Sequence, residues 1–359
     1  MALMDYLLYD AHLHFGDMTR FEELEEYRLR AGLAGAVLVS LPYPGWVNFN
    51  REVLQAKMRK PEVYRALAAF DFVYKIGEGK EWAPPQQGSR LEKPKPLAVQ
   101  VREFAEIGFD GLKVWAGKPA FQKLLGMAPD GGEFSGAFKA AADEGMPVLL
   151  HAGDPPDFWT KRAAGWKPFT EYISQAARVA AEHPRTRFVF PHMLFLARDL
   201  GSLADFLDAH PNAFLDVAPG NYFYAPLSER REEAARFFGN YAGRILFGTD
   251  GLFFPKTFRL FDYMDAGGVY RRFKNLYDFF FMASTVDNPY PYTMKEIPEV
   301  TGPVLETEAA RELACGACER LFFDGESRRI NREKAFHYIN TFPRGAGEAG
   351  GTGRSRLYG

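Results

Sequence analysis

The sequence lacks the features that mark several classes of protein. Its 359 residues include only two cysteines, Cys315 and Cys318, which is too few for a disulfide framework. Lys and Arg total 44 against 46 Asp and Glu, so the formal net charge is −2 and there is no basic surplus for nucleic acid. No apolar run approaches the roughly 18 residues of a membrane span, and the N-terminus lacks the basic region of a signal peptide. These absences predict a cytoplasmic protein without a nucleic-acid or membrane partner.

The composition that is present is that of a globular protein. Hydrophobic residues make up 47% and charged residues 25%, enough apolar material to bury a large core. Aromatic residues reach 15%, with 33 Phe, 17 Tyr and 5 Trp. That excess fits a Phe-rich core and also fits a pocket lined by aromatic rings.

Short apolar runs alternate with helix-like stretches along most of the chain. We expect strands at residues 6–10, 35–41, 64–70, 111–115, 147–151, 187–191, 213–217 and 244–248. We expect helices at residues 20–31, 97–107, 136–144, 170–183, 200–210 and 228–238. The strand runs are continuously apolar, as in strands buried on both faces.

Eight strands alternating with helices predict an α/β protein, a (β/α)8 TIM barrel. The alternative is an open doubly wound sheet, but no Gly-x-Gly-x-x-Gly follows the first strand. We expect one domain over residues 1–325, insertions included, and a C-terminal extension over residues 326–359 that ends in a Gly-rich tail.

Two connections, after the third and eighth strands, are too long for simple turns. They cover about residues 71–96 and 251–303, and the second is rich in Phe and Tyr. In a barrel both would lie on the face that carries the active site, so we expect the second to close over the mouth and add aromatic residues to the pocket. An aromatic interface between subunits, and hence a homo-oligomer, would explain the same composition.

Histidines gather at the carboxyl ends of the predicted strands. His12 and His14 follow the first strand, His151 ends the fifth and His192 ends the sixth, while Asp250 holds the equivalent position after the eighth. Residues i and i+2 of a strand point to one side, so His12 and His14 can converge. Imidazoles and a carboxylate suit zinc and similar divalent ions, and the pattern therefore predicts a metal site.

These motifs resemble the amidohydrolase superfamily, in its amidohydrolase-related branch of metal-dependent TIM-barrel hydrolases and decarboxylases. The matching pieces are Asp10-Ala-His12-Leu-His14, His151, His192 and Phe247-Gly-Thr-Asp250, followed by a closing helix at Ala314-Cys-Gly-Ala-Cys-Glu-Arg-Leu-Phe-Phe. His-x-His alone is a weak signal, but in order with the other three pieces it is specific. The resemblance covers about residues 6–323.

The resemblance implies a role for each matching residue. His12, His14, His151 and Asp250 would bind one divalent ion, with zinc expected and manganese as the alternative. Asp250 would also take a proton from water, and His192 would polarise the substrate or stabilise developing negative charge. Such an ion lowers the pKa of water from 15.7 to about 7, and a nearby carboxylate can then accept the proton.

Further residues are candidates for substrate binding. Lys113 lies on the fourth strand, where two-metal members of the superfamily carry a carbamylated lysine, so a two-metal site is the alternative to one ion. Trp115, Trp159 and Tyr222 follow strands and would suit a ring-bearing substrate, although packing within loops explains them equally well. Cys315 and Cys318 are interpreted as structural.

The sequence therefore predicts a metal-dependent hydrolase that acts on a C–N or C–O bond of a small, cyclic or aromatic, carbonyl compound. One alternative is a non-oxidative decarboxylase of an aromatic or unsaturated acid. In many decarboxylases of this branch Glu replaces the first His, so His12 favours hydrolysis. The second alternative is a barrel that binds a ligand without catalysis, which the full set of five site residues disfavours.

Overall fold

The computed structural model describes residues 6–41, 48–71, 95–155, 159, 166–218, 223–256, 263–289, 297–324 and 327–341. Within them the chain is an α/β protein built on one curled parallel sheet of nine strands, in the order β8-β7-β6-β5-β4-β3-β2-β1-β9. The strands are β1 (Tyr9–Phe15), β2 (Gly35–Val39), β3 (Tyr64–Ala69), β4 (Gly111–Gly117), β5 (Val148–Ala152), β6 (Phe188–Phe190), β7 (Ala213–Asp216), β8 (Ile245–Leu246) and β9 (Gly251–Phe253).

The two ends of this strand order belong to one stretch of chain. β8 pairs with β7, and β9 pairs with β1. Only four residues of chain separate β8 from β9. Between them Ala11 N donates to Phe247 O at 2.8 Å, and Asp250 N donates to His12 O at 2.8 Å. The sheet therefore curls until its first strand is hydrogen-bonded to the stretch that carries its last two strands.

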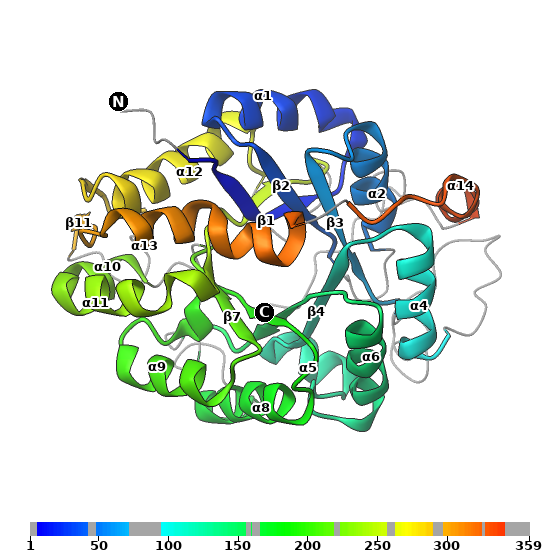
Figure 1. Cartoon of the computed structure of the whole chain (residues 1–359), viewed down its shortest axis with the longest axis horizontal. Coiled ribbons are helices and arrows are strands. Elements are labelled where there is room, and N and C mark those ends of the chain that lie inside the picture. The colour runs from blue at the N-terminus through cyan, green and yellow to red at the C-terminus, as the bar shows by residue number, and fades with distance from the viewer. Residues whose placement is uncertain are drawn as a thin grey trace.

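Helices lie around the outside of the curled sheet (Figure 1). They are α1 (Phe21–Ala31), α2 (Asn50–Arg59), α4 (Leu97–Ile107), α5 (Pro119–Leu125), α6 (Gly132–Asp143), α8 (Phe169–Glu182), α9 (Leu200–Ala209), α10 (Tyr224–Glu229), α11 (Arg231–Tyr241), α12 (Ala266–Phe281), α13 (Thr307–Arg311) and α14 (Arg332–Thr341). A short hairpin of β10 (Thr285–Asp287) and β11 (Glu299–Thr301) follows α12. None of the helices described is both long and apolar enough to cross a membrane.

Several boundaries agree with the sequence and others correct it. α4 spans the predicted residues 97–107, since Gly108 ends it with a φ of +117° that other residues rarely adopt. The predicted first strand, 6–10, is wrong, because β1 begins at Tyr9 and carries both histidines within it. The predicted helix 228–238 is two helices, α10 and α11, which meet at Arg230.

The segment 251–303 also departs from the expectation of a loop over the mouth. Its central part forms α12, which packs against α1 in the outer layer, because the Phe and Tyr residues of α12 have a second apolar surface to cover there. Phe273 on α12 contacts the ring of Tyr27 on α1, with centroids 6.1 Å apart. The root of the segment and Arg272 of α12, which donates to Asp250 O at 2.6 Å, remain near the carboxyl ends of the strands, and residues 257–262 and 290–296 lie outside the described residues. Residues 72–94, most of the predicted loop after the third strand, lie outside the described residues.

The interior of the sheet is filled by one small cluster of apolar side chains. Its strand residues are Tyr9, Ala11, Val37, Val39, Leu67, Leu149, Val189 and Leu246. Cys315, Ala317, Cys318 and Leu321 pack against them from a helical segment that continues α13 through the π-helical turns η4 (Glu312–Gly316) and η5 (Glu319–Phe323). Both cysteines are free and buried in this cluster, which supports their structural interpretation.

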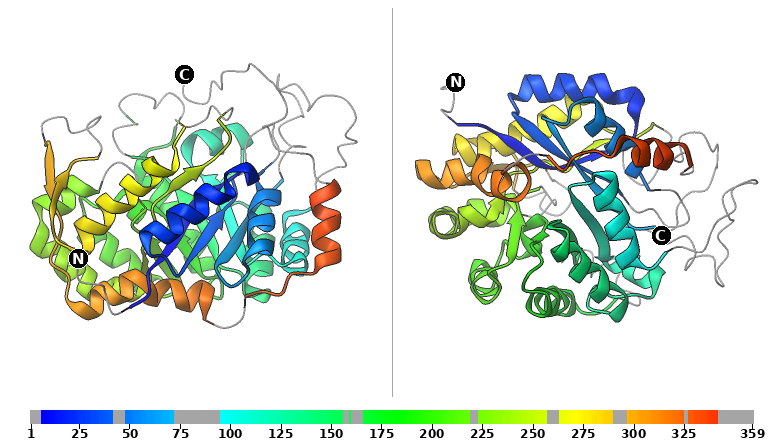
Figure 2. Two further views of the ribbon diagram at one scale, coloured as in Figure 1. Left: turned by 90° about the horizontal axis from the view of Figure 1, so that it is seen from above. Right: turned by 45° about the vertical axis from the view of Figure 1, so that its right-hand side comes forward.

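The end of the described chain packs against the side of the molecule. α14 lies beside α4 and α2, and is the red helix at the right of the left-hand view in Figure 2. Asn50 Nδ2 donates to Tyr338 Oη at 3.0 Å, and the same amide group exchanges hydrogen bonds with the backbone of Ala69 at the end of β3. The first part of the predicted extension thus contacts the sheet domain, while residues 342–359 lie outside the described residues.

Candidate metal centre

His12, His14 and Asp250 bring three potential ligand atoms together at the carboxyl ends of the strands. His12 Nε2 lies 3.3 Å from His14 Nε2, and Asp250 Oδ1 lies 3.3 Å from His14 Nε2 and 3.7 Å from His12 Nε2. One ligand atom from each residue lies within 4.8 Å of the others. Three of the four predicted ligands therefore form a group of the size that one divalent ion needs.

A β-bulge in β1 aims the two histidines into this group. Asp10 pairs with Ala36 and Leu13 with Leu38, so β1 has one residue more than β2 over the same length. Before the bulge, the odd-numbered residues Tyr9 and Ala11 face the interior cluster. After the bulge, the even-numbered residues face the interior instead. His12 and His14 consequently face the same interior as Ala11, which a regular strand would not allow.

The second ring nitrogens of both histidines are held by acceptors. His12 Nδ1 lies 2.8 Å from Asp216 Oδ2, and His14 Nδ1 lies 3.2 Å from Val39 O. A carbonyl oxygen and a carboxylate only accept, so Nδ1 carries the proton in each ring and Nε2 presents a lone pair. Two lone pairs and a carboxylate oxygen then face one another, an arrangement that a cation would stabilise.

Asp10 ties β1 to the stretch that carries Asp250. Its carboxylate accepts from Thr249 N at 3.0 Å, Thr249 Oγ1 at 2.6 Å, Tyr27 Oη at 2.8 Å and His12 N at 3.2 Å. Burial raises the pKa of Asp10 to about 6, although these hydrogen bonds oppose the shift. A Cβ on Gly248 would lie 2.9 Å from His12 Cβ, so the close approach of the two strands requires glycine there.

Asp250 occupies a strained position between β8 and β9. Its φ is +51°, in the left-handed region, and its side chain is 24% exposed, unlike the enclosed histidines. Arg272 of α12 donates to Asp250 O at 2.6 Å, which supports this backbone conformation. Strain of this kind is concentrated at functional sites, where the surrounding structure holds it in place.

The electrostatic environment favours neutral imidazoles and an ionised carboxylate. Burial lowers the pKa values of His12 and His14, and the nearby Lys113 lowers them further. Burial by itself would raise the pKa of Asp250, but the neighbouring imidazoles, with His14 Nε2 nearest at 3.3 Å, outweigh it and hold that pKa well below its usual range. These are the protonation states in which histidine and aspartate bind a metal.

His192 and His151 lie next to the three-residue group. The His192 ring centroid is 5.6 Å from that of His12, and the His151 centroid is 5.2 Å from that of His192. His192 begins the turn η2 (His192–Phe195), in which four successive residues have φ between +50° and +60°. His151 Nε2 lies 2.9 Å from Gly153 O, so its assignment as the fourth metal ligand stays a prediction.

The predicted substrate-binding residues fall in different places. Lys113 Nζ is buried 3.5 Å from His12 Nε2, and burial lowers its pKa to about 8. Trp115 meets His151 edge to face, with centroids 6.3 Å apart. Trp159 packs against Trp166 and against Phe169 and Tyr172 of α8, which fits a packing role. Tyr222 lies outside the described residues.

Two further residues complete the surroundings of the group. Phe254, at the root of segment 251–303, has its ring centroid 5.9 Å from that of His14, so this part of the segment does bring an aromatic ring to the site. Asp216, at the end of β7, contacts His12 and was not among the predicted site residues. Its only signal in the sequence is a carboxylate that closes the apolar run Ala213–Leu215.

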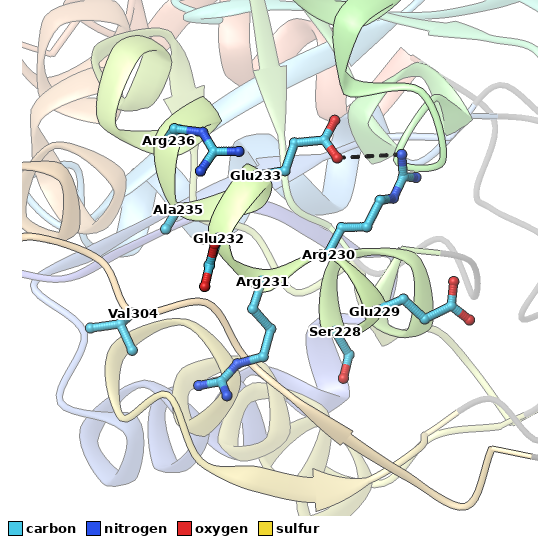
Figure 3. Close-up of a pocket in the computed structure, with 9 residues that line it drawn as sticks. All are labelled: Ser228, Glu229, Arg230, Arg231, Glu232, Glu233, Ala235, Arg236 and Val304. Carbon is cyan, nitrogen blue, oxygen red and sulfur yellow. Dashed lines mark ion pairs between the residues drawn. The ribbon is translucent and has the colours of Figure 1, made fainter.

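A pocket of about 600 Å³ lies away from this group, at the junction of α10 and α11. Figure 3 shows its lining of arginine and glutamate side chains from the two helices, with Val304 opposite them. Arg230 pairs with Glu233 across the junction at 3.6 Å, and Arg231 donates to Gly302 O at 2.9 Å. These paired charges are those of a solvated surface, and the pocket shares no residue with the metal group.

The sequence profile of the amidohydrolase family (amidohydrolase 2) matches residues 9–321, which include all of these side chains. The chain belongs to the amidohydrolase family. This is a family of metal-dependent enzymes, as the resemblance in the sequence implied. The search of curated proteins found no match.

Solved structures of similar fold have very different sequences. A probable 2-pyrone-4,6-dicarboxylic acid hydrolase from Acinetobacter baumannii, with citric acid bound, matches with 12% identity and a TM-score of 0.51, covering 88% of this chain and 99% of that one. A 2,6-dihydroxybenzoate decarboxylase from Rhizobium matches with 13% identity and a TM-score of 0.53, covering 89% and 100%. A 5-carboxyvanillate decarboxylase from Novosphingobium aromaticivorans, with bound manganese, matches with 11% identity and a TM-score of 0.50, covering 90% and 99%. At these identities the likeness shows the fold alone.

Proposed function

We propose that this amidohydrolase is a metal-dependent hydrolase that cleaves a C–N or C–O bond, amide, lactone or ester-like, in a small cyclic or aromatic carbonyl compound. The observation that carries the proposal is the convergence of His12 Nε2, His14 Nε2 and Asp250 Oδ1 at the carboxyl ends of the strands. In a (β/α)8 barrel, which is how we interpret the curled sheet, that face carries the active site.

One divalent ion fits the residues present. Three acceptor atoms face one another in a buried site, and we assign His151 as the fourth ligand, in place of its contact with Gly153 O. Imidazoles with one carboxylate suit zinc, and manganese is the alternative. When bound, such an ion polarises a carbonyl group and lowers the pKa of a water molecule.

The side chains around the ion then divide the chemistry between them. Asp250 accepts the proton of the attacking water, since its carboxylate is ionised and is partly open to the site. His192 faces the group from η2 and, when its Nε2 is protonated, donates to the carbonyl oxygen and stabilises the negative charge that develops there. Burial of His12 and His192 keeps bulk water from competing with the substrate.

Lys113 gives the site a preference for anionic substrates. Its ammonium group is buried beside His12 with the carboxylates of Asp250 and Asp216 nearby, and we assign it to a carboxylate or oxyanion of the substrate. The rings of Trp115 and Phe254 border the group and suit an aromatic or unsaturated ring, to which we add Trp159 and Tyr222 from the sequence. A carbamylated Lys113 that bridges two ions is the alternative.

Non-oxidative decarboxylation of an aromatic or unsaturated acid is the second candidate function. The observation in its favour is that a decarboxylase matches this fold as well as the hydrolase does, with TM-scores of 0.53 and 0.51. His12 in the first motif favours hydrolysis, as the sequence indicates. In either case the substrate is a small molecule and the setting cytoplasmic.

The deciding experiment assays the purified protein with and without added Zn²⁺ or Mn²⁺ on two sets of compounds. One set contains lactones and amides such as 2-pyrone-4,6-dicarboxylate, and the other contains aromatic acids such as 2,6-dihydroxybenzoate. Ring opening without CO₂ release supports the hydrolase, and CO₂ release supports the decarboxylase. Stoichiometric metal with no turnover of either set would favour a barrel that only binds its ligand. We expect metal analysis to give about one ion per chain, whereas two ions would support the carbamylated lysine.

A further inference from the structure

Asp216 contacts two of the histidines of the site at once. It ends β7, and its side chain is 1% exposed. Oδ2 lies 2.8 Å from His12 Nδ1, 204 residues away in the sequence. Oδ1 accepts from His192 N at 2.8 Å and from Ala218 N at 3.0 Å. One carboxylate therefore joins the ring of a proposed metal ligand to the backbone of the proposed charge-stabilising residue.

Through its hydrogen bond with Ala218 N, Asp216 also influences the ring of His192. Ala218 O lies 3.1 Å from His192 Nδ1, and because a carbonyl oxygen only accepts, that nitrogen carries the proton. Asp216 holds Ala218 in place through its amide and holds the first residue of the strained turn η2 through the amide of His192. Both neutral rings thus have Nδ1 protonated and Nε2 left without a proton: His12 Nε2 is free to bind metal, and His192 Nε2 donates to an oxyanion once it is protonated as well.

We propose that Asp216 is a positioning residue that fixes the Nδ1–H tautomer and the ring orientation of both His12 and His192. The proposal rests on the proposed function, since it concerns the ligand and charge-stabilising roles of those two rings. Partners of this kind raise the basicity of a ligating imidazole, and their loss weakens metal binding about 10- to 100-fold. A purely structural Asp at a strand end would affect stability without changing either tautomer.

Asp216→Asn separates these two roles, because the amide differs from the carboxylate at only one of the three contacts. The two backbone N–H groups at Oδ1 require an acceptor, so the amide oxygen takes that position. The amide NH₂ then faces His12 Nδ1 and donates to it. His12 is driven to the Nε2–H tautomer, in which the nitrogen that should bind metal carries a proton.

The matched control is Asp110→Asn. Asp110 is also a buried carboxylate that accepts from a backbone amide, Ala66 N at 2.8 Å, but it precedes β4 at the opposite end of the strands from the metal group. Its loss lowers stability without reaching either histidine. A change seen in both variants would therefore report general destabilisation.

The first measurement needs neither metal nor substrate. Ring nitrogens of ¹⁵N-histidine-labelled, metal-free protein are observed by NMR at pH 8, with the His12 signals assigned by comparison with His12→Gln. We expect Nδ1–H for His12 in the native chain and after Asp110→Asn, and Nε2–H after Asp216→Asn. An unchanged His12 tautomer in the folded Asp216→Asn protein would overturn the proposal, whether or not the chain proves to be a hydrolase.

The second measurement is Zn²⁺ affinity, by competition with a chromogenic chelator. We expect affinity about 10- to 100-fold weaker after Asp216→Asn and unchanged after Asp110→Asn. Equal affinities for the native and Asp216→Asn proteins would refute the positioning role. Failure of the native chain to bind Zn²⁺ or Mn²⁺ would instead refute the proposed function, with the tautomer result still deciding the arrangement around Asp216.

Discussion

Two buried polar groups, at opposite ends of the strands, differ in how completely their hydrogen bonds are satisfied. Near the amino end of β4, Lys57 Nζ donates to Gly108 O at 2.6 Å, Asp110 Oδ1 at 2.8 Å and Arg328 O at 3.0 Å, which uses all three protons of the ammonium group. At the carboxyl ends, the lone pairs of His12 and His14 face Asp250 Oδ1. The first group needs nothing further, whereas the second has three acceptor atoms and the ammonium group of Lys113 beside only one of them, 3.5 Å from His12 Nε2.

The comparison shows how to distinguish a structural polar cluster from a functional one. Both are buried, and both contain a carboxylate group. In the Lys57–Asp110 pair each donor meets an acceptor, so the pair joins α2, β4 and the chain before α14. In the metal group the ring N–H donors point outward, to Asp216 and Val39, and three acceptors face inward, where Lys113 Nζ lies 3.5 Å from His12 Nε2 alone. This excess of hydrogen-bond acceptors over donors inside the metal group is what identifies a site for a positively charged ligand.

The largest effect is expected from removing the carboxylate of the inward-facing group. Asp250→Ala loses both a proposed ligand and the proposed proton acceptor, and turnover should fall at least about 10⁴-fold. Steady-state kinetics at saturating metal check this. An active Asp250→Ala protein would show that the group of His12, His14 and Asp250 is not the catalytic centre.

The next largest effect is expected on the stability of the protein when the Lys57–Asp110 pair is broken. Lys57→Ala leaves Asp110 as a buried charge without its cation, which should cost about 3–5 kcal/mol in the free energy of unfolding. Urea denaturation measures this loss, and metal affinity should stay the same. If Lys57→Ala instead weakened metal binding while stability was retained, the two groups would not be independent.

A smaller effect is expected from His192, beside the metal group. His192→Ala should keep the metal and lower kcat about 10²–10³-fold, as for the loss of a donor that stabilises transition-state charge. The bound metal is measured in the same samples. A variant that loses its ion would make His192 a ligand and would favour the two-metal arrangement with Lys113.

The smallest effect comes from a third carboxylate, Glu52 of α2, which is partly buried and has one enclosed oxygen. Its Oε2 makes no hydrogen bond within the described structure, and burial raises its pKa to about 7 from 4.5. Because the folded state holds the proton more tightly than the unfolded state, stability falls as the pH rises from 4.5 through 7. Glu52→Gln should therefore stabilise the protein by about 1–3 kcal/mol at pH 8 and by little at pH 4.5. Urea midpoints at the two pH values test this, and equal gains at both would exclude a titrating Glu52.

Local signals account for the parts of the fold that were predicted well. α4 could be bounded because Pro96 precedes it and Gly108 stops it, so both ends are marked by backbone chemistry. β1 could not be bounded, since the apolar run before Tyr9 resembles a strand as closely as the histidine motif does. α12 was missed within an aromatic segment whose helical face became evident only against α1.

The sequence by itself determined which residue types meet at the site and in what order. The alternation His12-Leu-His14 and the placement of Asp250 after an apolar run are local properties, and they also carry the match to the family. These features sufficed to predict three side chains that converge, because the carboxyl ends of parallel strands share one edge.

Only the tertiary structure decided which atoms face one another. The bulge in β1 depends on pairing with β2, and the proton on His12 Nδ1 depends on Asp216, 204 residues away. His151, with the same sequence signal as His192, turned its Nε2 to Gly153 O. Side-chain orientation is set by partners that the chain meets only on folding, and no pattern of neighbouring residues encodes them.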